Sequence, residues 1–253
     1  MKQLIFLLTL FFIAGSAGFS QKKKDFEKPI NVLVFSKTAG YRHASISSGV
    51  KMLYDLSPKQ NWIITATEDA SFFNDANFKK IDVVVFLNPT GDGLNDDEQK
   101  AFEKWAKKGK GIVGIHAATD FEYEWPFYGN LIGAYFLSHP PAQKATVVFE
   151  NFDHPAMKPF EGKESYTTID EYYAFKKNPR PNVHVLAHLD ENSIVKSNND
   201  TWKMGDHPVI WWNEKDGIRV FYTVYGHTPE AFQDPLIIEH IKNAINWAAR
   251  RID

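Results

Sequence analysis

The chain of 253 residues contains no cysteine. This absence excludes disulfide bonds, a lipid anchor attached to cysteine and every mechanism that uses a thiol nucleophile. The sequence also lacks an excess of one charge, because 29 Lys and Arg residues are balanced by 31 Asp and Glu residues. No basic stripe of the kind that phosphate contacts require is present, so we do not expect nucleic acid as a partner.

Long apolar runs are absent apart from one near the N-terminus, between Leu4 and Ala14. A lysine precedes this run, and small residues and a lysine cluster follow it, which is typical of a secretory signal peptide. The run is too short for a comfortable membrane span. The sequence therefore predicts a signal peptide over residues 1–20 and a mature protein in the periplasm or secreted, with no membrane span after cleavage.

Residues 29–253 are predicted to form a single α/β domain. In the first half, strand-like and helix-like segments alternate, and several strand-like segments are almost entirely apolar, which favours a parallel sheet covered by helices on both faces. In the second half, strand-like segments follow one another without helices between them. We expect a mostly parallel, flavodoxin-like sheet flanked by helices, with the C-terminal strands either added antiparallel or forming a flap. The predicted strands are 31–36, 62–67, 82–87, 112–116, 146–150, 171–175, 183–189, 209–213 and 219–224.

Polar residues follow three of the predicted parallel strands, in the segments 37–43, 88–92 and 116–122. The carboxyl ends of parallel strands form the ligand-binding edge of an open α/β sheet. These three segments should therefore converge in space.

His116 ends the predicted strand in the stretch GIVGIHAATDFEYEW. The surrounding small residues resemble a nucleophile elbow, where a strand turns sharply into a helix and exposes the apex side chain. An imidazole at this position can act as a metal ligand, a general base or a hydrogen-bond donor. It can equally be a buried structural histidine paired with the backbone.

Seven ordered motifs resemble the ThuA-like (trehalose utilization) family from about Pro29 to Ala249. They are GYRHASI, VVVFLNPTGDGL, GIVGIHAATDFEYEWPFYGNLIGAYFLSHP, DHPAM, DEYYAF, DHPVIWW and YGHTPEAF. This resemblance implies a fold similar to that of class I glutamine amidotransferases. It also implies a role in sugar metabolism, linked to disaccharides such as trehalose and to 3-keto-glycosides. Those amidotransferases carry a cysteine at the apex, so a glutaminase activity is not expected here.

Candidate site residues lie within these motifs. We predict a catalytic role for His116, Glu171 and His227, in which the carboxylate and imidazoles serve as general acid and base. A catalytic zinc site built from three histidines, or from two histidines and a carboxylate, is a further hypothesis, although no metal-binding spacing is present. For Arg42 and Glu171, the alternatives are a surface arginine and a residue at the rim of a strand. The predicted metal ligands are His116, His139 and His227, and the predicted substrate-binding residues are Arg42, His43, Asp120, Glu122, Trp125 and Tyr172.

The sequence leaves two function classes open. The first is an exported enzyme that acts on a disaccharide or 3-keto-glycoside by hydrolysis, elimination or isomerisation. The second is a non-catalytic periplasmic protein that binds sugar or assists its uptake. The segment after the first strand lacks Gly-x-Gly-x-x-Gly, so no nucleotide cofactor is expected. The partner is expected to be a small carbohydrate, and assembly into a homo-oligomer remains open.

Overall fold

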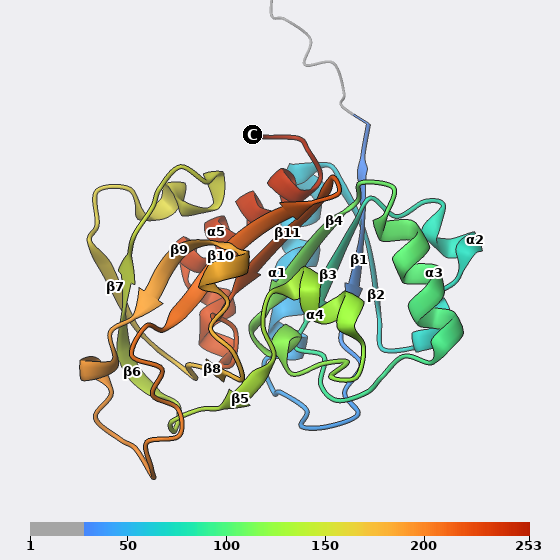
Figure 1. The fold of residues 1–253 in the computed structure, drawn as a ribbon. Coiled ribbons are helices and arrows are strands. Elements are labelled where there is room, and N and C mark those ends of the chain that lie inside the picture. The colour runs from blue at the N-terminus through green and yellow to red at the C-terminus, as the bar shows by residue number, and fades with distance from the viewer. Residues whose placement is uncertain (1–27) are drawn as a thin grey trace, which may run out of the picture.

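A computed structural model describes residues 28–253, so the predicted signal peptide lies outside the described residues. One nine-stranded sheet runs through this part of the chain, in the order β2-β1-β3-β4-β11-β10-β9-β6-β7 (Figure 1). Its strands are β1 (Ile30–Phe35), β2 (Trp62–Thr67), β3 (Val83–Leu87), β4 (Gly111–Ile115), β6 (Gln143–Phe149), β7 (Ser165–Asp170), β9 (His184–Leu189), β10 (Pro208–Lys215) and β11 (Ile218–Thr223). Two short strands, β5 (Phe136–Ser138) and β8 (Ala174–Phe175), pair separately.

The five strands β2, β1, β3, β4 and β11 are parallel to one another. β3 and β4 are buried along their whole length, which explains why both sequences are almost entirely apolar. The strands β10, β9, β6 and β7 then extend the sheet in antiparallel fashion. The predicted fold class, a mostly parallel sheet with added antiparallel strands, is confirmed.

β11 differs from the expectation for the C-terminal strands, because it lies parallel to β4. Its antiparallel partner is β10, to which it is joined by the two-residue turn Asp216–Gly217. Both turn residues have positive φ angles, 51° and 75°. Such a turn matches the twist of the flanking strands, so it fixes a tight hairpin at the boundary between the two halves of the sheet.

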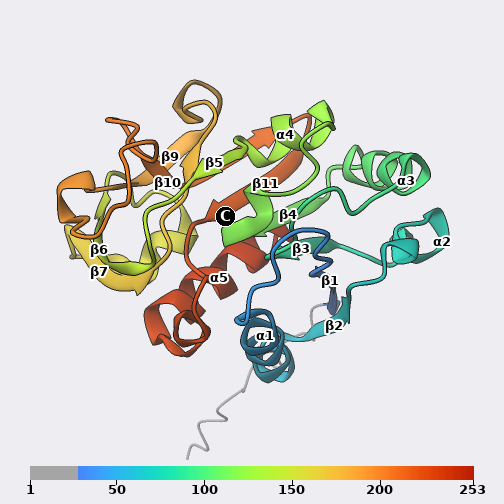
Figure 2. The same ribbon diagram turned by 90° about the horizontal axis from the view of Figure 1, so that it is seen from below.

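Helices cover both faces of the sheet. Figure 2 shows α1 (Ile46–Gln60) and α5 (Pro235–Ala248) on one face and α3 (Asp96–Ala106) and α4 (Pro126–Ile132) on the other. A short helix, α2 (Asp75–Phe78), packs against α3. The helix α3 begins with a capping box in which the side chains of Asn95 and Glu98 satisfy each other's backbone N–H groups.

Several details of the C-terminal half were not predicted, among them the short strand β5. The strand expected at 171–175 is limited to β8, and the residues before it, 165–170, form the edge strand β7. α4 was not predicted either. Among residues 28–253, no helix combines the length and the apolar character needed to cross a bilayer.

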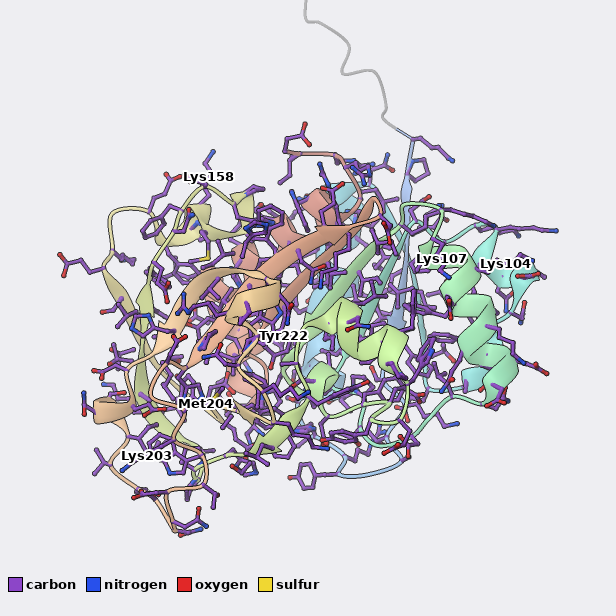
Figure 3. All side chains as sticks on the ribbon, in the orientation of Figure 1. Lys104, Lys107, Lys158, Lys203, Met204 and Tyr222 are labelled. Carbon is purple, nitrogen blue, oxygen red and sulfur yellow. The ribbon has the colours of Figure 1, made fainter. Side chains whose placement is uncertain are left out.

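Figure 3 shows how the side chains are distributed between the core and the surface. Tyr222 of β11 lies in the interior of the molecule and is fully buried, whereas Lys104 and Lys107 project from α3 at the periphery. The phenol of Tyr222 donates a hydrogen bond to the backbone carbonyl of His116 at 2.9 Å. The core therefore extends directly to the loop that carries the candidate site.

Candidate functional site

Five side chains from different parts of the chain meet at one edge of the sheet. His43 precedes α1, His116 follows β4, His139 follows β5, Glu171 follows β7 and His227 lies in the loop after β11. One ligand atom from each of His43, His116, Glu171 and His227 lies within 4.8 Å of every other one. We call these four residues the histidine–glutamate cluster. The convergence predicted for His116, His139 and His227 is thus present in the structure, and His43 and Glu171 lie with them.

His116 occupies the apex of a sharp turn. Its φ angle is 47°, in the left-handed region that non-glycine residues rarely adopt. The short helix η2 (His116–Thr119) begins at the same residue, as in the nucleophile elbow that the sequence resembles. Its Nδ1 lies 3.0 Å from the carbonyl oxygen of Val224. Because a carbonyl only accepts hydrogen bonds, Nδ1 carries the proton and Nε2 presents a lone pair to the cluster.

A buried network beneath the cluster joins the loops. The amide of Asn88 donates to the hydroxyl of Ser45 and to the carbonyl of Gly226, both at 3.0 Å. Ser45 also donates to the Gly226 carbonyl at 2.7 Å, and the backbone N–H of Ala117 donates to the Asn88 side-chain oxygen at 3.3 Å. The loops after β1, β3, β4 and β11, three of which carry imidazoles of the cluster, are therefore fixed to one another.

Asp170 fixes the loop that carries His227. This fully buried carboxylate accepts the backbone N–H groups of Gly226 and His227, each at 2.9 Å, and that of Glu171 at 2.8 Å. Burial raises the pKa of Asp170, while His116 and the three backbone donors act in the opposite direction. Gly226 has a φ angle of 133°, and a Cβ atom there would lie 2.8 Å from a methyl carbon of Ile115. Only glycine fits this position without a shift in the surrounding residues.

Glu171 contacts three imidazoles. Its Oε2 lies 3.1 Å from Nδ1 of His227 and 3.6 Å from Nε2 of His116, and its Oε1 lies 3.0 Å from Nδ1 of His139. Burial opposes ionisation of this carboxyl, but the three imidazoles outweigh that effect and lower its pKa well below the usual range. The carboxylate is therefore ionised at neutral pH.

His43 differs from the other imidazoles of the cluster in the hydrogen bonding of its ring nitrogens. It is only 3% exposed, and neither ring nitrogen has a hydrogen-bond partner among the described residues. Burial, together with the neighbouring His116 and His227, lowers the pKa of His43 to about 3. A neutral ring of this kind offers a free lone pair to whatever occupies the cluster.

The imidazoles around Glu171 differ in their exposure to solvent. The side chains of His139 and His227 are 38% and 21% exposed, whereas that of His116 is fully buried. Tyr41, which is 66% exposed, stands edge-on to His43 with 4.9 Å between ring centroids. A ligand that arrives from solvent would thus meet Tyr41, His139 and His227 before it reached His116.

Two predicted substrate-binding residues, Arg42 and Glu122, bind other protein groups and not the cluster. Arg42 forms a bidentate ion pair with Glu68, at 2.6 and 2.7 Å, on the exposed surface. Glu122 is buried and accepts the backbone N–H groups of Gly93 and Leu94, both at 2.8 Å. Its role here is to hold the loop before α3.

Of the remaining predicted substrate-binding residues, Trp125 and Tyr172 are buried in the core and Asp120 is half-buried. Trp125 packs against aromatic rings of the core, and Tyr172 is fully buried with its hydroxyl donating to the Thr168 carbonyl at 3.0 Å. Asp120 accepts a hydrogen bond from Tyr123 at 2.5 Å. Burial raises the pKa of Asp120, while the hydrogen bond from Tyr123 and the nearby His116 and His139 oppose that rise.

Tyr173 contributes to the site without having been predicted. Its ring lies 4.3 Å from that of His116 and 5.8 Å from that of His139, between centroids. The buried His207 holds its backbone, because Nε2 lies 2.9 Å from the Tyr173 carbonyl and Nδ1 lies 2.8 Å from a carboxylate oxygen of Glu191. The motif DEYYAF contains Asp170 and Tyr173, but its spacing does not reveal which side chains face the cluster.

The family model described as ThuA, trehalose utilisation, matches residues 31–248. The chain belongs to the ThuA family. A search of curated proteins found no match.

Solved structures resemble the ThuA chain at low sequence identity. A ThuA-like protein from Bacteroides uniformis is 24% identical, with a TM-score of 0.72 over 88% of this chain and 92% of that one. A ThuA-like protein from Parabacteroides merdae is 20% identical, with a TM-score of 0.70 over 88% and 90%. The glutaminase domain of Trypanosoma brucei CTPS is 10% identical, with a TM-score of 0.51 over 88% and 95%. These similarities show a shared fold of the glutamine amidotransferase type.

Proposed function

We propose that this ThuA-family protein is an exported enzyme that acts on a disaccharide or a 3-keto-glycoside. The trehalose-utilisation family supports a carbohydrate as the substrate. The N-terminal segment, which resembles a signal peptide, is the basis for proposing export to the periplasm or beyond the cell. A glutaminase reaction is not proposed, because the apex residue is His116 and the chain contains no cysteine.

The observation that carries the enzymatic proposal is the position of Glu171. An ionised carboxylate lies within 3.6 Å of three imidazoles at the ligand-binding edge of an α/β sheet. A site that only binds sugar needs hydrogen-bond donors and aromatic surfaces, but it does not need several titratable groups held together. Such a group of carboxylate and imidazoles is suited to moving protons at neutral pH.

Elimination from a 3-keto-glycoside is the reaction that this set of groups would serve most directly. The ketone at C3 acidifies the C–H bond at C2, so an imidazole such as that of His139 or His227 can remove that proton. The electron pair then forms a C1=C2 double bond while the C1–O bond breaks. The other of these two imidazoles, in its protonated form, would donate a proton to the departing oxygen. Addition of water to the double bond would complete a net hydrolysis.

The test is turnover by purified wild-type protein on a panel of disaccharides and their 3-keto derivatives, followed by chromatography of the products. Glu171→Gln keeps the shape of the side chain and removes the negative charge that pairs with the three imidazoles, so we expect kcat to fall by at least about 100-fold. Glu161→Gln, at an exposed position outside the histidine–glutamate cluster, is the matched control and should retain activity.

The same experiment separates the two function classes. A wild-type protein that binds sugars from the panel without converting any of them would refute the enzymatic proposal in favour of a sugar-binding protein. An unsaturated sugar among the products would identify elimination, whereas the free keto-sugar alone would indicate either direct hydrolysis or elimination followed by addition of water.

A further inference from the structure

We propose that the histidine–glutamate cluster binds one divalent transition-metal ion, such as Zn²⁺, through His43, His116, Glu171 and His227. The inference concerns the same residues as the proposed function, and it identifies a cofactor for that site. The four ligand atoms lie within 4.8 Å of one another. Bonds of roughly 2.0–2.2 Å to Zn²⁺ place tetrahedral ligands about 3.5 Å apart, so small inward shifts of the side chains would complete the coordination.

The lone pairs of the imidazoles are available to such an ion. His116 uses Nδ1 as a donor to Val224, which leaves Nε2 without a proton. A hydrogen bond from the second ring nitrogen to a backbone carbonyl is the usual way in which proteins orient a metal-binding histidine and fix its tautomer. The full burial of His116 is incompatible with direct attack on an incoming substrate but is well suited to a ligand.

Unpaired nitrogens provide independent support. Within the part of the chain that the structure describes, both ring nitrogens of His43 are buried without a hydrogen-bond partner. Nε2 of His116 and Nδ1 of His227 also make no hydrogen bond, although they lie 3.6 and 3.1 Å from Oε2 of Glu171. Buried polar atoms are nearly always paired, so several unpaired atoms facing one another require an explanation. A single cation between them would satisfy one nitrogen of each ring.

Glu171 supplies the anionic ligand, and the two oxygens of its carboxylate have different neighbours. Oε2 lies between His116 and His227, at 3.6 and 3.1 Å, and is therefore the oxygen directed at the proposed ion. Oε1 lies 3.0 Å from Nδ1 of His139, which is also 3.0 Å from the carbonyl of Pro140. His139 thus uses Nδ1 as a donor and orients the carboxylate from outside.

This assignment replaces His139 of the predicted metal set with His43 and Glu171. Three imidazole nitrogens and one carboxylate oxygen form a donor set that suits zinc and the neighbouring first-row metals. It contains no thiolate, in keeping with a chain that has no cysteine. The partial exposure of His227 leaves a route by which water or a sugar oxygen could reach the ion.

The test is metal analysis of the mature protein, purified without a polyhistidine tag, stripped with a chelator and then dialysed against micromolar Zn²⁺. We expect about one zinc per wild-type chain by mass spectrometry, and less than about a tenth of that in His43→Ala, His116→Ala and Glu171→Gln. His188→Ala, at the remote Glu150 ion pair, is the matched histidine control and should retain one zinc. Loss of the outer contact in His139→Ala should weaken zinc binding by about 10- to 100-fold.

A thermal melt of each stripped protein, with and without Zn²⁺, guards against variants that fail to fold. Zinc should raise the Tm of wild-type protein and of His188→Ala but not that of Glu171→Gln, whose shape is unchanged. Wild-type protein that binds no zinc, cobalt or manganese at micromolar concentration would overturn the metal site, as would equal zinc binding by Glu171→Gln. Turnover of a sugar by metal-free protein would refute the ion as a cofactor and leave the carbohydrate proposal intact. Stoichiometric zinc without turnover of any sugar would support the metal site and refute the enzymatic proposal.

Discussion

Replacement of Asp170 by asparagine should destabilise the protein strongly although the two side chains have nearly the same shape. The carboxylate of Asp170 is fully buried and accepts three backbone N–H groups, two on Oδ1 and one on Oδ2. Asparagine can keep the two hydrogen bonds on its oxygen, but its NH₂ group would face the N–H of Gly226. Two donors would then point at each other in the interior.

The expected size of this effect follows from the lost interactions. A hydrogen bond to a charged group contributes roughly 1.5–3 kcal/mol, and leaving a buried donor unpaired costs a further 1–3 kcal/mol or so. We therefore expect Asp170→Asn to lower the free energy of unfolding by about 3–5 kcal/mol, which corresponds to a Tm lower by roughly 10 °C for a domain of this size. The measurement is urea denaturation followed by circular dichroism.

Asp234→Asn is the matched control. Asp234 caps α5 by accepting the N–H groups of Leu236 and Ile237, and it also accepts the hydroxyl of Tyr166. Asparagine caps helices as well as aspartate does, and a hydroxyl can reverse its role and accept from the new amide. We expect a loss below about 1 kcal/mol. An equally small loss for Asp170→Asn would refute the reasoning, because it would mean that the Asp170 carboxyl carries a proton and no anionic acceptor is required.

Three further predictions concern acid stability, backbone geometry and substrate affinity. Burial lowers the pKa of His240 to about 4 and that of His154 to about 3, below the unfolded value of roughly 6.5, so their stabilising contribution is complete above pH 6.5 and is lost as the pH falls. For His240 alone this loss of unfolding free energy is about 3 kcal/mol between pH 7 and pH 4. Urea titrations at several pH values should therefore show that the stability of His240→Asn falls less in acid than that of wild-type protein, and an unchanged pH dependence would contradict this. Gly226→Ala should lower the free energy of unfolding by at least about 2 kcal/mol and impair zinc binding, whereas Gly162→Ala should lower it by only about 1 kcal/mol, because Gly162 also has a positive φ but no atom lies within 4 Å of the new Cβ. Equal losses for the two variants in chemical denaturation would show that crowding plays no part. Tyr41→Ala should raise KM for a sugar substrate up to about 10-fold with kcat and Tm nearly unchanged, because an exposed ring beside the cluster offers a stacking surface. An unaffected KM in steady-state kinetics would show that Tyr41 does not belong to the binding site.

The fold could be predicted largely because its central strands are buried on both faces. The sequences of β3 and β4 are apolar throughout, which a one-sided antiparallel sheet would not require. β7 is harder to recognise, because this edge strand is half exposed and its sequence, SYTTID, has only a weak apolar pattern. The parallel placement of β11 depends on contacts with β4, which lies more than 100 residues earlier in the chain, and no local signal encodes that choice.

The site could be predicted at the level of loops but not of individual side chains. The rule that carboxyl ends of parallel strands converge correctly brought together the segments that carry His43 and His116. The same rule cannot separate neighbours on one loop. Arg42 and His43 are adjacent, yet one pairs with Glu68 on the surface and the other is buried in the cluster. Loop side chains diverge according to local backbone angles, which residue type and spacing do not determine.

The position of His116 can now be understood in physical terms. A nucleophile elbow exposes its apex residue to substrate, but in this protein the apex imidazole is fully covered by Tyr173, His43 and His227. The left-handed backbone is retained, so the turn still directs the side chain toward the ligand-binding edge. An imidazole that is held by Val224, closed off from solvent and left with a free lone pair can bind an ion more readily than it can attack a sugar. The same backbone geometry that presents a nucleophile in related folds would here hold a metal ligand at the buried end of the site, and proton transfer would be left to His139, which is not one of the proposed ligands.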